Sequence, residues 1–534
     1  FNPWRRSNKA AAKFSRSLTR IAELGLITPE RRRELAARPP NILVEIPENR
    51  APRFTEAARR SGRDGLVRTT LDLGLQDSAR RFLREQLAVL DRHAARNAAI
   101  IVIENATGAV RVLTSVALDT PDAETEINGA LIARHPGSTL KPFVYLEAID
   151  RQVLTAATLL PDTPDAMLAA FGNYDPHNFN KRFHGPVRVR EALATSLNVP
   201  AVLALNAAGP RRVFGRMGDW GLNPESQTLE DCGAGFVLGN LPVRLLDVSN
   251  AYVALARGGV YSPPRLLEDD LQPARRLASE AAVAIVEDIL CDNRARDRAF
   301  GSRSPLHIPG HRAAVKTGTS SSFRDSWTVG YDRDFTVGVW FGNYNGRSMD
   351  GLRTVQSAAP VWNRMMRHLC RVRGSRPLTA PADGETLSGQ TICTLSGMRP
   401  SPESRGTLTE WFLPGTEPES DASGFFVGGG IVLPDEYKSW CRSNFNFLHA
   451  TTAAAGTDSL AIDFPENGTV YVIDRDIPAI QQALVLKASS DHQPVTWSVN
   501  GQVTSNPWPL RKGTWLITAR TEDGARASST IRVE

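Results

Sequence analysis

The sequence predicts a multidomain protein in which a large α+β domain precedes a small all-β domain. Two β-rich runs surround Asn-Ala-Thr-Gly at 105–108, which is a hairpin signal, and alternating runs return after Ala313. The chain between Ser138 and about Asp292 has a mainly helical pattern. Strands at both ends with helices between them predict one sheet built from distant segments, with a helical lobe inserted. A chain of 534 residues, 41% of them hydrophobic, suffices for about three such units.

The regions before the first predicted hairpin are mostly helical. Residues 10–38 have an Arg-rich helical pattern with a Thr-Pro-Glu start signal at 28–30. Residues 39–64 are punctuated by proline and are predicted to be mostly irregular. In residues 72–98 the apolar positions recur at helical spacing. This pattern predicts an amphipathic helix that buries Leu75, Phe82, Leu83, Leu87 and Leu90.

Strands and a further helix follow the predicted lobe. Three β-rich runs occupy 313–320, 325–332 and 335–343, and a helix is expected over 359–372. Residues 373–445 are rich in Pro, Gly and Ser and have no clear period. From about Leu460 several short alternating runs are separated by turn residues, which predicts a small sandwich with tryptophans in its core.

Charge, cysteine content and hydropathy exclude several classes of function. The 63 basic and 57 acidic residues leave a net charge of +6, without a basic tract interleaved with aromatics, so nucleic acid is not an expected partner. The five cysteines form no CxxC pair, and Ile-Pro-Gly separates His307 from His311, so no metal site or cofactor is expected. No apolar run is long enough to span a bilayer. Because the chain opens without Met, we expect a fragment whose membrane anchor precedes Phe1.

Three short motifs carry the chemistry. They are Ser138-Thr-Leu-Lys141, Ser196-Leu-Asn198 and Lys316-Thr317-Gly318. Among the eight lysines only Lys141 has a serine three residues earlier, and only Lys316 precedes Thr-Gly. The second motif is weak by itself, since a copy begins at Ser498 in the predicted β-domain. The strong evidence is the order and context of the three motifs. The first follows the predicted hairpin, the second lies in the predicted helical lobe, and the third opens a predicted strand.

This set predicts a nucleophilic serine. A serine hydroxyl is a weak nucleophile until a neighbouring base takes its proton. On a helix, Ser138 and Lys141 would lie on one face, and a lysine can be the base if burial or a second cation lowers its pKa. Amides at the start of that helix could stabilise an oxyanion.

Around these motifs the chain resembles the class A penicillin-binding proteins of the penicillin-binding protein 1C type. The resemblance runs from residue 64 to the end, through stretches such as HPGSTLKPFVY (135–145), VRVREALATSLNVPAV (187–202) and VKTGTSSSFRDSW (315–327). It implies a transpeptidase domain of the penicillin-binding/serine β-lactamase-like fold at 64–375. It further implies the trailing helical part of a glycosyltransferase domain with a linker at 1–60, an irregular linker at 376–449, and an immunoglobulin-like β-domain at 450–534.

The resemblance also implies residue roles. Ser138 would be the nucleophile, Lys141 its base, and Ser196 a proton relay to the leaving group. Lys316 would keep the local field positive. The substrate would be held by the remaining motif residues and their neighbour, namely Asn198, Thr317, Gly318 and Thr319. The amides of Ser138 and Thr319 would form the oxyanion hole.

The implied function is D,D-transpeptidation of peptidoglycan stem peptides, with a D-Ala-D-Ala donor and an amine acceptor, and covalent inhibition by β-lactams. The implied location is the periplasmic face of the bacterial inner membrane, and the β-domain would hold cell-wall or division proteins. The full-length parent would also be a glycosyltransferase, although this chain is expected not to polymerise glycan by itself.

Three alternatives remain open from the residues. A D,D-carboxypeptidase and a β-lactamase share the acyl-enzyme chemistry, and a non-catalytic β-lactam sensor or cell-wall scaffold would share part of the motif set. A class A β-lactamase turns over because a glutamate, in a Glu-x-x-x-Asn arrangement between the second and third motifs, orients a hydrolytic water. None of the five glutamates between 199 and 315 has an Asn four residues later, so hydrolysis is not favoured.

Overall fold

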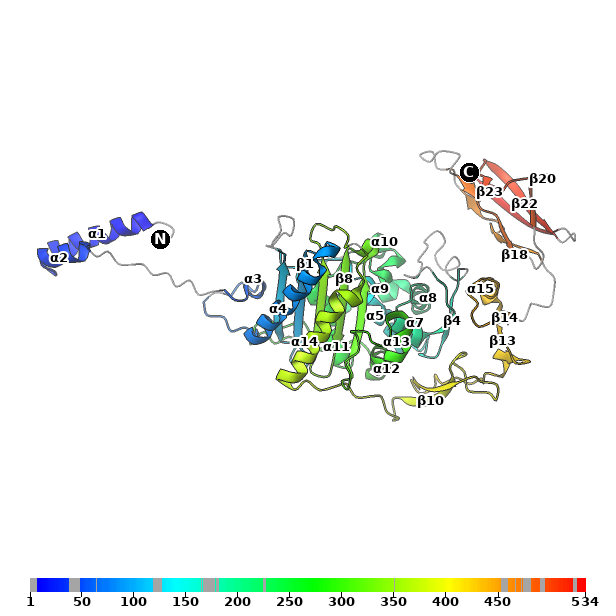
Figure 1. The fold of residues 1–534 in the computed structure, drawn as a ribbon, viewed down its shortest axis with the longest axis horizontal. Coiled ribbons are helices and arrows are strands. Elements are labelled where there is room, and N and C mark those ends of the chain that lie inside the picture. Colours follow the sequence, from blue (N-terminus) through cyan, green and yellow to red (C-terminus); the bar gives the residue numbers. More distant parts are fainter. Residues whose placement is uncertain are drawn as a thin grey trace. The chain divides into compact units, whose positions relative to one another are not determined.

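The computed structural model describes residues 7–37, 49–63, 65–118, 127–164, 166, 178, 182–223, 227–349, 351–452, 460–465, 467–471, 473, 482–489, 495–521 and 526–534. The chain divides into two compact units, Phe1–Pro52 and Arg53–Glu534 (Figure 1). Among the described helices, none is both long and apolar enough to cross a lipid bilayer.

The first unit contains two helices that contact each other, α1 (Ser7–Glu23) and α2 (Pro29–Ala37). The predicted start signal is confirmed, because Thr28 Oγ1 accepts a hydrogen bond from the Arg31 amide at 3.2 Å, as a helix cap does. Of the segment predicted to be irregular, 39–64, residues 39–48 lie outside the described residues. For the described part the prediction was wrong, because a helix, α3 (Pro52–Arg59), forms there and buries Phe54, Ala57 and Ala58.

The predicted sheet of distant segments is confirmed. It has five antiparallel strands in the order β2-β1-β9-β8-β7. The hairpin around 105–108 joins the first two strands, and the strand of the third motif forms one edge. The bounds are β1 (Asn97–Glu104), β2 (Val110–Ala117), β7 (Ala314–Thr319), β8 (Asp325–Tyr331) and β9 (Phe335–Gly342).

Helices cover both faces of this sheet, which explains why its central strands are apolar without alternation. The predicted amphipathic helix is confirmed as α4 (Leu73–Leu90), but it ends before the predicted 98, because β1 begins at Asn97. It packs with α14 (Ala358–Arg373) on one face, where Leu83, Val102 and Trp362 share a core. On the other face α11 (Leu245–Ala256) contacts β1, β8 and β9. A strand that is buried on both sides cannot alternate apolar and polar residues.

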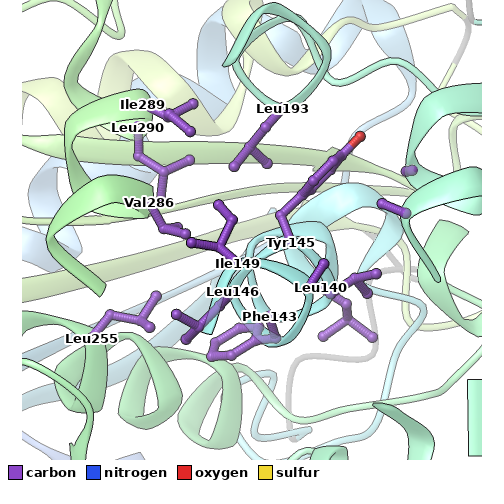
Figure 2. Close-up of a cluster of buried hydrophobic side chains, with 14 of the residues drawn as sticks. Leu140, Phe143, Tyr145, Leu146, Ile149, Leu193, Leu255, Val286, Ile289 and Leu290 are labelled. Atoms are coloured by element: carbon purple, nitrogen blue, oxygen red, sulfur yellow. The ribbon is translucent and has the colours of Figure 1, made fainter. Parts of the chain in front are cut away.

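A helical lobe lies beside the sheet, between β2 and β7 in sequence (Figure 1). Its central helix, α5, is buried from Lys141 to Ile149, and most of its residues are apolar, as expected for a helix inside a core. Figure 2 shows Phe143, Leu146 and Ile149 of that helix clustered with Leu193 and Val286 of two others. The lobe helices used below are α5 (Lys141–Asp150), α7 (Val189–Thr195), α8 (Val199–Ala208), α12 (Glu280–Cys291) and α13 (Asn293–Phe300).

Residues 376–449 were expected to form an irregular linker, but residues 376–452 instead form a small module of short strands that packs against the lobe. We call them the docked module. Its core includes Tyr437 and Trp440, and Trp440 Nε1 donates to the Phe183 carbonyl at 3.3 Å. The strands are short and separated by glycine and proline turns, which hides their period. They are β10 (Ser388–Cys393), β11 (Thr407–Phe412), β12 (Phe426–Val427), β13 (Gly430–Leu433) and β14 (Thr451–Thr452).

The predicted C-terminal β-domain is confirmed as a strand-rich region. A five-stranded sheet has the order β16-β23-β22-β19-β20, and a β15–β18 ribbon contacts β22 and β23. Trp497, Trp508 and Ile517 are in its core. The described strands are β15 (Ala461–Phe464), β16 (Val470–Tyr471), β17 (Ala483–Leu484), β18 (Lys487–Ser489), β19 (Val495–Val499), β20 (Gln502–Val503), β21 (Trp508–Pro509), β22 (Gly513–Thr521) and β23 (Arg526–Val533), of which β17 and β21 pair with each other.

Candidate active site

The first motif lies on a 3-10 turn rather than on the α-helix that was expected. The turn η2 (Gly137–Leu140) runs directly into α5, of which Lys141 is the first residue. Three residues complete one turn of a 3-10 helix, so side chains three apart are eclipsed. Ser138 is half-buried and Lys141 is fully buried. The turn therefore places the Ser138 and Lys141 side chains on the same side of the segment.

The Lys141 amine reaches the second motif. Lys141 Nζ donates to the Ser196 carbonyl at 2.8 Å, the Leu197 carbonyl at 2.8 Å and Asn198 Oδ1 at 2.7 Å. These acceptors match the three donors of an ammonium group. Burial lowers the pKa of Lys141 well below its usual value, the charge of Lys316 lowers it further, and Asp162 opposes the shift. Because its pKa is lowered, Lys141 can lose its proton more readily than an exposed lysine.

Ser196 has an unusual backbone conformation. It caps α7 with φ of 67°, a left-handed conformation that is uncommon outside glycine. The Ser196 amide donates to the Leu193 carbonyl at 3.2 Å, and the Leu197 amide donates to the Ala192 carbonyl at 3.0 Å. These bonds end the helix in the manner of a C-terminal cap. Positive φ at a non-glycine residue is a feature that clusters at functional sites.

Lys316 connects the third motif to the second. It lies on the edge strand β7, is 3% exposed, and donates from Nζ to Ser196 Oγ at 2.7 Å and to the Thr317 carbonyl at 3.0 Å. Burial, followed by the charge of Arg296, lowers the pKa of Lys316 to about 7. Two buried lysines with lowered pKa values thus contact Ser196. The structure brings Lys141, Ser196, Asn198 and Lys316 into one hydrogen-bonded group.

The remaining residues of the third motif lie along the same strand. Thr319 Oγ1 is 2.8 Å from Thr354 Oγ1, which also donates to the Gly318 carbonyl at 3.2 Å. Thr317 is buried. Thr354 was not identified from the sequence, because only the fold brings it next to the strand.

Three glycines let the nucleophile turn approach this strand closely. A Cβ on Gly137, which has φ of +55°, would lie 2.6 Å from the Thr319 amide nitrogen. A Cβ on Gly318 would overlap the Pro136 carbonyl, and one on Gly239 would overlap the backbone of Gly137. Backbones at this separation have no room for a side chain. The segments that contain the amides of Ser138 and Thr319 are therefore adjacent.

A buried carboxylate supports the second motif from behind. Asn178 Oδ1 accepts from the Asn198 amide at 2.9 Å, and Asn178 Nδ2 lies 2.8 Å from each carboxylate oxygen of Asp162. His184 Nδ1 is 2.7 Å from Asp162 Oδ2. Sequence analysis missed Asp162 and Asn178, since they belong to no motif. Among the glutamates considered for water activation, Glu225 lies outside the described residues.

A second cluster of titratable groups lies away from the motifs. His311 Nε2 is 3.0 Å from Asp332 Oδ2, and Cys370 Sγ lies 3.5 Å and 3.6 Å from the two ring nitrogens of His311. A thiol at equal distances from both nitrogens lies against the ring rather than on a lone pair. Ser375 Oγ and the amides of 334 and 335 also donate to Asp332. The cluster is a satisfied hydrogen-bond group that packs β8, α14 and the loop before β7.

A cavity of about 380 Å³ lies between the lobe and the docked module, not at the motifs. Aromatic and proline side chains line it together with Thr158 and Ser396. None of the motif residues contributes to it, so the candidate site is defined by its hydrogen bonds and not by this cavity.

Three sequence profiles of known protein families match parts of this chain. The sequence profile described as "Penicillin binding protein transpeptidase domain" matches residues 98–366. The profile "Penicillin-Binding Protein C-terminus Family" matches 449–533, and "Penicillin-binding protein 1A, C-terminal domain" matches 385–420, within the docked module.

Two curated relatives of this chain are penicillin-binding proteins. The chain is 31% identical over 425 residues to penicillin-binding protein 1C of Escherichia coli, covering 78% of this chain and 53% of that protein. It is 26% identical to penicillin-binding protein 1A of Neisseria cinerea, covering 55% of this chain and 38% of that protein. The chain thus spans about half or less of these relatives.

The crystal structure of penicillin-binding protein 1A from Haemophilus influenzae superposes with a TM-score of 0.62 at 18% identity, covering 79% of this chain and 84% of that one. That of the penicillin-binding protein PonA1 from Mycobacterium tuberculosis superposes with a TM-score of 0.52 at 22% identity, covering 62% of this chain and 93% of that one. At these identities the likeness concerns the fold. With the transpeptidase profile over half of its length and a relative of 31% identity over more than three quarters of it, this chain belongs to the penicillin-binding proteins and contains their transpeptidase domain.

Proposed function

We propose that this chain is a peptidoglycan D,D-transpeptidase that works through an acyl-enzyme on Ser138. The observation that carries the proposal is the hydrogen-bonded group in which the buried lysines Lys141 and Lys316 both donate to Ser196. Lys141 itself follows the candidate nucleophile, Ser138, by three residues. Such a group can remove a proton from one atom and deliver it to another, which acyl transfer requires.

In the first step, Ser138 Oγ attacks the carbonyl of the D-Ala-D-Ala bond and its proton passes to Lys141. Lys141 accepts this proton only as a neutral amine, which its burial and the charge of Lys316 favour. A substrate amide that donates to Asn198 Oδ1 would compete with Lys141 for this acceptor. The ammonium form of Lys141 would then be less stable relative to the neutral amine. The amides of Ser138 and Thr319 would stabilise the oxyanion.

In the second half of that step, the C–N bond breaks and D-Ala leaves as an amine after it receives a proton by way of Ser196. The acyl group remains on Ser138 as an ester. An amine of a second stem peptide then attacks the ester, loses a proton to the same group and forms the cross-link, while the Ser138 hydroxyl is restored. Thr317 and Thr319 would bind the terminal carboxylate of the donor, and Gly318 would allow its close approach.

The test uses a labelled penicillin and a pair of peptides. Peptide mapping should place the penicillin adduct on the segment HPGSTLK, and Ser138→Ala should remove it. Mass spectrometry of products from a pentapeptide donor and an acceptor amine should show a cross-linked peptide that penicillin suppresses. An adduct on another peptide removes the proposal, whereas loss of D-Ala without cross-link assigns a D,D-carboxypeptidase. Labelling with neither product assigns a sensor or scaffold.

The setting of this activity is part of the proposal. We expect the protein at the periplasmic face of the inner membrane, with peptidoglycan stem peptides and β-lactams as its ligands. The C-terminal β-domain is proposed to bind cell-wall or division proteins, and the longer parent is proposed to polymerise glycan as well.

A further inference from the structure

A buried carboxylate of the docked module contacts the short helix that carries the second motif. Glu410, on β11, is fully buried. Its two oxygens accept from Arg190 of α7, Oε2 from Nε at 2.7 Å and Oε1 from Nη2 at 2.5 Å. This is a two-point contact, which fixes orientation as well as distance. Glu410 lies far outside the matched transpeptidase segment 98–366.

The same arginine joins the docked module to the rest of the lobe. Arg190 also donates to Asp288 of α12 at 2.6 Å and to Asp292 at 3.1 Å. Asp288 in turn pairs with Arg312, which stands two residues before β7. Both the helix that ends at Ser196 and the strand that carries Lys316 are thus attached to one buried group of ions.

Arg190 is close enough to Ser196 to control its place. It is the second residue of α7, and Ser196 follows the last, which is about 9 Å at the rise of an α-helix. A helix of this length has little stability of its own, so its position depends on its contacts. On the apolar face of α7, Leu193 packs into the core shown in Figure 2. On its polar face, Arg190 is held by Glu410, Asp288 and Asp292.

Charge explains why a neutral residue would not substitute for Glu410. Arg188 Nη1 also lies 3.7 Å from Glu410 Oε2, so this carboxylate separates two buried guanidinium groups. Burial disfavours the charge on Arg190, but the hydrogen bonds and charges of Glu410 and Asp288 raise its pKa above the usual value. Without Glu410 the two arginines would repel each other at the start of α7.

We infer that Glu410 is a positioning residue for Ser196: through Arg190 it holds α7 where the Ser196 hydroxyl meets Lys316 and the Ser196 carbonyl meets Lys141. The docked module is then a working part of the catalytic apparatus and not a spacer. The inference deepens the proposed function and rests on it for the acylation measurements alone.

The test compares Glu410→Gln with Glu403→Gln in the full chain. Glu403 is an exposed glutamate of the same module and serves as the matched control. We expect Glu410→Gln to lower the penicillin acylation rate constant by about tenfold or more, as displaced catalytic groups do, with little change in the drug concentration for half-saturation. The control should stay within about twofold of the parent. Glu410→Asp keeps the charge, should recover part of the rate, and replaces the Gln variant if that one fails to fold.

Two further measurements separate positioning from a general loss of stability. In a Ser196→Ala background, Glu410→Gln should cost clearly less than in the parent, because the Ser196 hydroxyl is already gone and only the contact of the backbone carbonyl with Lys141 can still be displaced. Hydrogen exchange of the amides in 189–198 should become faster in Glu410→Gln, while exchange in 325–342 stays unchanged. Equal losses in both backgrounds, or unchanged exchange in 189–198, would overturn the inference. If the parent itself is not acylated, the proposed function fails, and the exchange measurement still decides the role of Glu410.

Discussion

Replacing Lys316 with methionine should stabilise the protein while it disables the site. Burial and Arg296 lower the pKa of Lys316 from 10.5 to about 7. Each pKa unit corresponds to about 1.4 kcal/mol, so folding loses roughly 4–5 kcal/mol at pH 7 by forcing this amine towards its neutral form. Methionine has a similar length and no charge, and it removes that cost.

Part of the gain is offset by lost hydrogen bonds. Lys316 donates to Ser196 Oγ and to the Thr317 carbonyl, and an unsatisfied buried acceptor costs about 1–3 kcal/mol. The expected net stabilisation of Lys316→Met at pH 7 is therefore about 2–3 kcal/mol. Acylation by penicillin should fall by about 10²-fold or more, because the field that favours a neutral Lys141 and the contact with Ser196 are both lost.

The pH dependence has a definite sign. Between the folded pKa of about 7 and the unfolded pKa near 10.5, the unfolded state binds more protons, so the parent gains stability as the pH rises. The advantage of Lys316→Met is complete below pH 7 and disappears above about pH 10.5. Urea unfolding of both proteins from pH 6.5 to 10.5 measures the difference, with the exposed Lys512→Met as control. A difference that does not shrink with rising pH would refute the reasoning.

Three further predictions concern packing, domains and the acyl-enzyme. Gly239→Ala, with φ of +103° and its Cβ against Gly137, should cost about 1–3 kcal/mol or more in unfolding free energy and slow penicillin labelling. Gly346→Ala, also at positive φ but in open space, is the control, and equal labelling rates would contradict the close-approach argument. Removing 453–534 should leave labelling unchanged, since the docked module with β14 is retained. A folded truncation that no longer labels would show that the β-domain is required. The penicillin adduct should persist for minutes by intact-mass measurement, because Asp162 is fully buried and already accepts from Asn178 and His184. Release within seconds that Asp162→Asn abolishes would identify it as a water-activating base.

Residues that belong to a recognisable motif could be predicted from the sequence. Residues whose role depends on contacts between distant segments could not. Ser138, Lys141, Ser196 and Lys316 could be singled out because each belongs to a short motif that can be read directly from the sequence. The hairpin at 105–108 and helix α4 were predictable because their signals are local.

Contacts between distant segments left no local signal. Glu410 is one of many glutamates until the fold places it on Arg190, 220 residues away. Asn178 belongs to no motif, and Gly239 reads as an ordinary turn glycine. The period of the docked module was invisible because its strands are only two to six residues long.

The strand order of the central sheet has a consequence for synthesis. β1 is almost entirely apolar, and its partner in the middle of the sheet is β9, which follows about 230 residues later. At about 5–20 residues per second, the ribosome needs roughly 10–50 seconds to make the intervening chain. Throughout that interval the nascent β1–β2 hairpin has a hydrophobic edge ready to pair with any extended neighbour. Aggregation during biogenesis, more than instability of the finished fold, is therefore the hazard that this topology brings.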